Sequence, residues 1–212
     1  MIRKLHIPIF YLLLTALSGC AVLDPGPPMA QVILPVRLQV AEISDRIPIQ
    51  LIVSLPVADG ATGSDRIMAL MNGFEVRALD TAKWVSPAPL MVQRLLIDSL
   101  EATRRIEAVG LEESGMDAKV RLAADLRRFF LRYDSPDAPP TAEIVLIFSL
   151  SDLTTGKAFA RKMIKVDQPC TANTLQEFVA AFSVGMSRVL SQSNEWVVAH
   201  LEAYLASETK SK

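Results

Sequence analysis

The chain has 212 residues, half of them hydrophobic, with 22 basic and 23 acidic side chains and a net charge of −1. This balance argues against nucleic acid as a partner, because binding to phosphates needs a basic surface. The length is sufficient for one domain with a substantial hydrophobic core.

The N-terminus carries the features of a secretory signal. Arg3 and Lys4 precede an apolar run over residues 7–17. This run is too short for a transmembrane helix, since spanning a bilayer takes about 20 residues. The tetrapeptide Leu-Ser-Gly-Cys that ends at Cys20 resembles a bacterial lipobox. An ordinary signal peptide or a short membrane anchor is the alternative. The lipobox interpretation predicts that residues 1–19 are removed and that Cys20 becomes an acylated N-terminus.

Lipidation would hold the protein on a membrane outside the cytoplasm, because two or more acyl chains give stable anchoring. Ala21 stands where lipoproteins retained in the inner membrane often carry Asp. We therefore predict the periplasmic face of the outer membrane, with the inner membrane as the alternative. Residues 20–31 contain three prolines and a glycine and are expected to form a tether. Acylation of Cys20 would leave Cys170 without a disulfide partner, so Cys170 is expected to be a buried or half-buried thiol.

The first half of the domain predicts strands. Val, Ile and Leu are frequent in residues 32–40 and 47–57, which indicates two strands with prolines near their ends. Two further runs, 65–71 and 74–79, flank an Asn-Gly pair at 72–73. This pair favours a tight turn with positive φ at both positions, so the sequence predicts a hairpin here.

The middle of the chain predicts a helix followed by three long strands. Residues 87–106 have prolines in the first turn and apolar side chains at helical spacing. Residues 120–133 alternate as a strand but change register near Phe129, which predicts a β-bulge. Residues 141–150 are almost wholly apolar, as in a central strand. Residues 157–166 follow after a turn and would pair back on that strand.

The last predicted element is a helix over residues 173–206 with one continuous apolar stripe. We expect the stripe to pack on the sheet; the alternative is that its last turns extend past the sheet and form a homo-oligomer. Residues 207–212 read as a polar, frayed tail. These elements predict one domain over residues 32–206 of the α+β class, with a mainly antiparallel sheet and two long helices packed on one face.

The sequence contains none of the motifs that carry common catalytic or metal chemistry. It has no glycine-rich phosphate loop, no HExxH and no CxxC pair. His200 is the only histidine after the signal, and it lies on a different predicted element from Cys170. This separation argues against a cysteine–histidine catalytic pair. We predict that the protein is not an enzyme and that it holds no metal and no cofactor other than the lipid on Cys20.

Short motifs between residues 65 and 105 resemble those of one family of envelope proteins. Their order is Asp65-Arg66-Ile67, the hairpin sequence Asn-Gly-Phe-Glu-Val, Trp84 followed by two prolines, Gln93, and a helix ending in Leu100-Glu101. With the lipobox, the tether and the long C-terminal helix, this order resembles the ABC-type transport auxiliary lipoprotein family, which includes paraquat-inducible protein C. Members often have tyrosines where this sequence has Met68, Leu70 and Leu79.

The resemblance implies a non-enzymatic subunit of an MCE-type envelope lipid transporter, which docks the MCE protein at the outer membrane. The partner-contact candidates are the polar or aromatic residues of the matching segment: Asp65, Arg66, Trp84 and Gln93. For Trp84 the alternative is a side chain that packs under the first helix. The second hypothesis is an assembly or plug lipoprotein for an outer-membrane β-barrel, and the third is a lipid-tethered hydrolase. Neighbouring genes for a permease, an ATPase and an MCE protein would favour the first hypothesis over the second.

Overall fold

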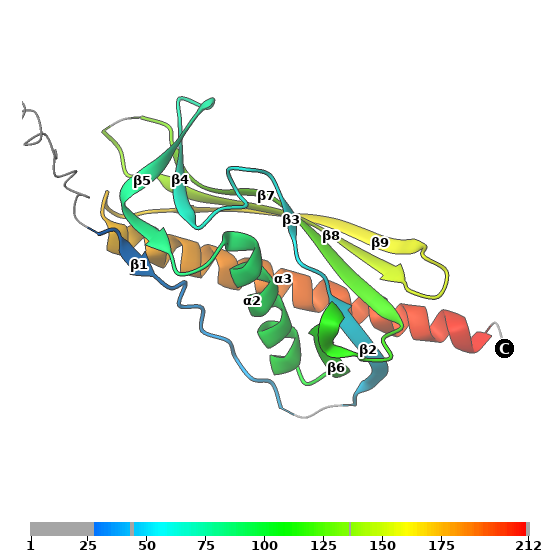
Figure 1. Cartoon of the computed structure of the whole chain (residues 1–212). Helices are drawn as coiled ribbons and strands as arrows, with labels where there is room; N and C mark the ends of the chain where they lie inside the picture. The colour runs from blue at the N-terminus through cyan, green and yellow to red at the C-terminus, as the bar shows by residue number, and fades with distance from the viewer. Residues whose placement is uncertain (1–27, 43–44, 136, 211–212) are drawn as a thin grey trace, which may run out of the picture.

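A computed structural model describes residues 28–42, 45–135 and 137–210. Within these residues nine strands form one sheet, and two long helices pack on one of its faces (Figure 1). The strands are β1 (Ala30–Val32), β2 (Ile47–Val53), β3 (Val57–Ala58), β4 (Arg66–Met71), β5 (Glu75–Trp84), β6 (Ile106–Leu111), β7 (Val120–Tyr133), β8 (Thr141–Asp152) and β9 (Ala158–Pro169). The helices are α2 (Ala88–Ala102) and α3 (Leu175–Lys210), and a 3₁₀ turn covers Glu112–Ser114. The predicted signal, Cys20 and most of the predicted tether lie outside the described residues.

Strand β7 is the centre of the sheet. Along one edge it pairs antiparallel with β8, and β8 pairs antiparallel with β9. Along its other edge three shorter strands, β2, β3 and β4, follow one another, and each runs parallel to β7. Outside them lie β6 beside β2, β5 beside β4, and β1 beside β5. β7 thus joins the half of the sheet that contains β8 and β9 to the half that contains the shorter strands.

The predicted α+β class with two helices on one face is confirmed. The pairings β4–β5, β7–β8 and β8–β9 are antiparallel and include the two longest ladders. The sheet is nevertheless mixed, since the other pairings between the described strands are parallel. Antiparallel neighbours are joined by short turns that a sequence displays, whereas parallel neighbours need longer connections. The parallel pairings were therefore not predicted.

The hydrophobic core lies between the sheet and the two helices. α3 packs along β8 and β9, while α2 packs on β2 and β6 and against α3. Ile144, Leu146 and Phe148 of β8 are fully buried in this core. Burying a side chain of this size stabilises the fold by about 1.5–3 kcal/mol. α3 comes close to β8 at Gly185, because a Cβ atom there would lie 3.0 Å from Cδ1 of Ile144.

Helix α2 is shorter than the sequence predicts. The prediction of a helix over 87–106 is wrong at its end: α2 stops at Ala102, and Arg104 adopts a left-handed conformation with a φ of 55°. The N–H of Arg104 donates to the carbonyl of Glu101 at 3.0 Å, which closes the last turn. Ile106 then begins β6, a strand that the sequence analysis did not identify. The left-handed position is usually occupied by glycine, so an arginine there gives no stop signal.

The N-terminal part of the domain differs most from its prediction. The strand predicted over 32–40 is wrong: β1 covers only Ala30–Val32 and starts inside the predicted tether. Residues 33–42 form a strap over the helices, in which Ser183 Oγ of α3 donates to the carbonyl of Pro35 at 2.6 Å. Proline has no N–H to donate to a strand ladder, which explains why this apolar segment does not extend β1.

Two predicted details of the sheet are confirmed. β7 covers Val120–Tyr133, and its register against β8 shifts between Leu126 and Arg128, which is the expected bulge. The β4–β5 hairpin turns at Asn72 and Gly73, whose φ angles are 54° and 78°. Both values are positive, as a type I′ turn requires.

Other elements have limits that differ from those expected. α3 continues through Lys210, so residues 207–210 are helical and not a frayed tail. The strand expected over 47–57 is divided into β2 and β3 by residues 54–56. Within the ranges that the structure describes, no helix combines the length and the apolar character needed to cross a bilayer.

Candidate functional site

Within the part of the chain that the structure describes, both helices pack on the same face of the sheet and no helix covers the other face, which we call the open face. Side chains alternate between the two faces of a strand, and the pairing register aligns them in rows across neighbouring strands. One row consists of Val57 on β3, Asp125 on β7, Ile147 on β8 and Met163 on β9. The adjacent row consists of Ala123, Ser149 and Arg161.

Apolar side chains on the open face are exposed. Val57 and Met163 are 69% and 65% exposed, and Ile147 between them is half-buried. We call these three residues the apolar row. The same strands bury their alternate side chains in the core, as Ile164 and Val166 of β9 show. The open face therefore carries exposed apolar side chains that the domain's own core does not use, with Asp125 between Val57 and Ile147. Exposed apolar surface of this kind is typical of an interaction site.

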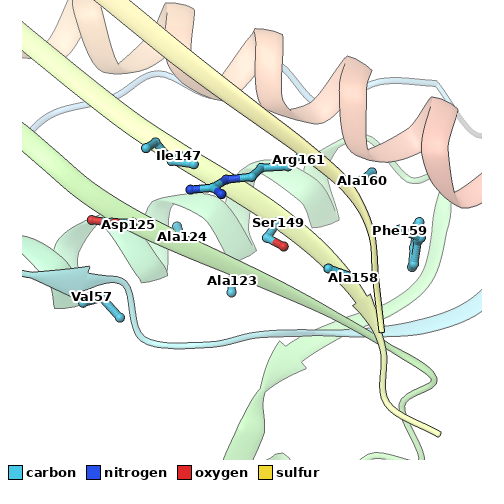
Figure 2. A pocket seen from close by; sticks show the side chains of 10 residues that line it. All are labelled: Val57, Ala123, Ala124, Asp125, Ile147, Ser149, Ala158, Phe159, Ala160 and Arg161. Atoms are coloured by element: carbon cyan, nitrogen blue, oxygen red, sulfur yellow. The ribbon is translucent and has the colours of Figure 1, made fainter. Parts of the chain in front are cut away.

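A groove of about 550 Å³ lies over this part of the open face (Figure 2). Small and apolar side chains and two charged ones line it: Val57, Ala123, Ala124, Asp125, Ile147, Ser149, Ala158, Phe159, Ala160 and Arg161. Figure 2 shows Arg161 extending from β9 across β8. Small-molecule sites enclose most of their ligand, whereas this groove lies open along the sheet. Its shape therefore suits a segment of another protein better than a small ligand.

Further along the same strands, a buried carboxylate is surrounded by cations. The side chain of Glu143 is buried, and Lys165 Nζ lies 3.2 Å from its Oε1. Arg128 Nη1 and Arg132 Nε each lie 3.7 Å from its Oε2. The hydrogen bond to Glu143 raises the pKa of the Lys165 ammonium above its ordinary value. Lys165 Nζ also lies 3.3 Å from Asp167 Oδ2, and Arg132 also pairs with Asp134. This cluster is therefore held by ion pairs within the domain, whereas the side chains of the apolar row have no such partners among the described residues.

Two of the four predicted partner-contact residues lie at the base of the β4–β5 hairpin. Lys83 Nζ donates to Asp65 Oδ2 at 2.7 Å, and this hydrogen bond lowers the pKa of the Asp65 carboxyl below its ordinary value. Arg66 Nη2 donates to the carbonyl of Leu79 at 2.9 Å and lies 3.7 Å from Asp80. Both side chains are half-buried, and contacts within the hairpin hold them in place.

The other two predicted residues, Trp84 and Gln93, are buried. Trp84 is 1% exposed, and its ring centroid lies 5.5 Å from that of Phe182 and 5.8 Å from that of Phe129. Gln93 Nε2 donates to the carbonyl of Val53 at 3.0 Å. Neither side chain is available to a partner at the surface. The structure places Trp84 in the core, as the packing alternative expected, but the rings that it contacts belong to β7 and α3 and not to the first helix.

We predict that Gln93→Leu lowers the free energy of unfolding by about 1–3 kcal/mol, because it removes a buried donor to the carbonyl of Val53 and nearly keeps the side-chain volume. Urea denaturation followed by circular dichroism measures the change. Arg94→Leu is the control on the same helix, since Arg94 is exposed. This control should change stability by less than about 0.5 kcal/mol. A Gln93→Leu protein as stable as the wild type would contradict the role of this hydrogen bond.

Cys170 is a buried free thiol, as predicted. Burial raises the pKa of this thiol to about 11, so it stays protonated at neutral pH and is a poor nucleophile. His200 lies on α3 with its Nδ1 2.8 Å from the carbonyl of Trp196. Among the residues that the structure describes, no group of three or more His, Cys, Asp and Glu side chains is arranged to hold a metal ion.

Sequence reasoning missed the open face. The available signal was the alternation within residues 157–166. There Met163 and Lys165 alternate with Ile164 and Val166. Such alternation marks a strand with one uncovered side. This strand, β9, pairs with β8, and β8 pairs with β7, so the outward side chains of the three strands form one surface.

Comparison with protein families agrees with the motifs in the sequence. Residues 34–192 match the family described as ABC-type transport auxiliary lipoprotein component. The chain belongs to this family. ABC-type transport auxiliary lipoproteins are membrane-anchored envelope proteins associated with ABC-type transport. No curated protein matches the sequence.

Solved structures share the fold of this auxiliary lipoprotein. The crystal structure of protein XCC0632 from Xanthomonas campestris, of family DUF330, is 22% identical with a TM-score of 0.73, covering 82% of this chain and 99% of that one. An uncharacterized protein of known structure is 13% identical with a TM-score of 0.64, covering 81% of this chain and 99% of that one. The PelC dodecamer from Paraburkholderia phytofirmans is 10% identical with a TM-score of 0.44, covering 71% and 93%. At these identities the likeness to the first two structures establishes a common fold.

Proposed function

We propose that this lipoprotein is a non-enzymatic auxiliary subunit of an MCE/ABC-type envelope lipid transport system. In this proposal, lipid on Cys20 holds the protein at the periplasmic face of the outer membrane, where the folded domain docks the MCE-domain protein. The family match carries the proposal, because it makes the chain an auxiliary component of ABC-type transport. The lipobox that ends at Cys20 and the residue Ala21 support the location.

We assign docking to the open face. The apolar row of Val57, Ile147 and Met163 includes one charged neighbour, Asp125, which lies between Val57 and Ile147. A second charged side chain, Arg161, lies in the adjacent row and lines the same groove as Val57 and Ile147. An apolar centre with a polar rim is the usual anatomy of a protein interface. The side chains that would carry acid–base or nucleophilic chemistry are sparse in this groove, which supports binding rather than catalysis.

Co-purification tests the proposal. The acylated protein, extracted from membranes in mild detergent, should retain the MCE-domain protein encoded in the same gene neighbourhood. An MCE-domain protein from a different transport system is the control and should not be retained. Retention of an outer-membrane β-barrel in place of the MCE-domain protein would contradict the proposal and favour an assembly or plug function.

We predict that Cys20→Ser abolishes acylation, because in a lipobox the lipid is attached to the sulfur atom of the cysteine. Labelling of cells with a radioactive fatty acid should mark the wild type and not the variant. The variant should also leave the membrane fraction or keep an uncleaved signal. Cys170→Ser is the matched control and should be labelled as strongly as the wild type, since Cys170 is buried. Labelling of the Cys20→Ser protein at the wild-type level would refute the anchor.

A further inference from the structure

The tip of the β4–β5 hairpin exposes an apolar side chain. Phe74 directly follows the turn residues Asn72 and Gly73 and is 81% exposed. The turn is held by a hydrogen bond from the N–H of Phe74 to the carbonyl of Met71 at 3.2 Å. Figure 1 shows the hairpin projecting beyond the rest of the sheet. The domain thus presents an aromatic ring on an ordered protrusion.

The first residue of β1 lies at the end of that strand nearer to this tip. β1 runs parallel to β5, with Ala30 beside Ala82 and Val32 beside Trp84. β5 runs away from the tip, because it begins next to Phe74 and ends at Trp84. Since β1 runs in the same direction, its first residue, Ala30, lies at the end of β1 that is nearer to Phe74 along β5.

The length of chain between Cys20 and β1 is sufficient to reach the level of the tip. β5 bulges between Ala78 and Lys83, so the distance is better taken along β4: the five residue steps from Arg66, opposite Lys83, to Met71 at the turn span about 17 Å at about 3.3 Å per residue. Ten residue steps separate Cys20 from Ala30 and span at most about 35 Å. A lipid on Cys20 can therefore place the membrane surface at the level of Phe74.

The charges beside the tip cancel. Arg77 Nε donates to Glu75 Oε1 at 2.7 Å, so these neighbours form an ion pair with no net charge. Phe is among the apolar residues that proteins bury at the boundary between headgroups and acyl chains. An exposed phenylalanine, the mutually paired charges of Glu75 and Arg77 and a tether long enough to reach the tip together favour a lipid surface as the occupant.

We propose that Phe74 inserts into the surface of the membrane that carries the lipid on Cys20, and that the hairpin thereby orients the domain. The inference rests on the acylation of Cys20 in the proposed function. The β8–β9 turn lies at the opposite end of the sheet and would point away from the membrane (Figure 1). A lipid at the end of a tether does not by itself fix the orientation of the domain relative to the membrane. Insertion of Phe74 would add a second membrane contact and so fix that orientation.

Tryptophan fluorescence on vesicles tests this orientation. Phe74→Trp reports on the hairpin tip, and Thr155→Trp in the exposed β8–β9 turn is the matched control at the other end of the sheet. The acylated proteins are reconstituted into phosphatidylcholine vesicles with plain or brominated acyl chains, because bromine quenches a tryptophan that touches them. The native Trp84 and Trp196 are buried in the core and give a constant background.

Brominated lipid should quench most of the emission that the Phe74→Trp substitution adds and none of that added by Thr155→Trp. Flotation of the same samples reports the anchor separately. Proteins that float while the Phe74→Trp protein stays unquenched would overturn the inference and leave the anchor intact, as would equal quenching of both proteins. Protein that fails to float would refute the anchor and this inference with it. An unquenched tip together with loss of MCE-protein capture in Phe74→Ser would make the tip a protein contact instead.

Discussion

Replacing Trp84 with alanine should lower the free energy of unfolding by about 3–5 kcal/mol and leave binding of a partner at the open face unchanged. The Trp84 side chain is buried and packs with Phe129 of β7 and Phe182 of α3. Its removal would leave a cavity where the sheet meets α3. Urea denaturation measures the stability, and titration calorimetry with the MCE-domain protein measures the binding at a temperature where the variant is folded.

Trp84→Phe is the matched control for this prediction. It keeps an aromatic ring beside Phe129 and Phe182 and leaves a smaller cavity, so the loss of stability should be smaller than for Trp84→Ala. A Trp84→Ala protein with wild-type stability and partner binding weakened by about 2 kcal/mol or more would contradict the packing role. Trp84 would then be an interface residue, as the motif in the sequence also allowed.

Elements whose signal is local could be predicted from the sequence. β7 shows its alternation and its bulge within one strand, and the turn at Asn72 and Gly73 depends on two adjacent residues. The apolar stripe of α3 is likewise contained in one helix. Each of these patterns follows from the backbone geometry of the element itself, independent of what packs on it.

Elements decided by distant partners could not be predicted. Ile106 falls at helical spacing with the apolar residues of α2, and only its pairing with Ile47 makes it the start of a strand. Leu34 sits in an apolar segment that resembles a strand, but it is buried as part of the strap over the helices. In both places tertiary contacts override the local pattern.

The candidate site depends even more on register. Val57, Ile147 and Met163 lie far apart in the chain and become one apolar row only when β3, β7, β8 and β9 pair in the observed alignment. Trp84 and Gln93 were candidates for partner contact but are buried. The sequence around a single aromatic or polar residue does not indicate whether another layer of the fold covers it. The motif therefore indicated the family, while the surface left free by the fold indicates where a partner can bind.

Met163→Asp should weaken binding of the MCE-domain protein by about 2 kcal/mol or more, which corresponds to roughly 30-fold in Kd. Met163 is one of the two exposed ends of the apolar row, and a carboxylate there would lose its hydration in an apolar contact without gaining a partner. The same exposure means that the stability of the free protein should change by less than about 0.5 kcal/mol. Titration calorimetry and urea denaturation of the same preparation measure the two effects.

Val184→Asp on α3 is the matched control, because it places the same charge at an exposed apolar residue of the helical layer. It should leave the Kd for the MCE-domain protein within about 2-fold of the wild-type value, as expected of a substitution outside the interface. Weaker binding in Val184→Asp with wild-type binding in Met163→Asp would place the docking surface on the helices. Since the sheet has two faces and the described helices cover one of them, this pair of variants decides which layer of the domain meets the partner.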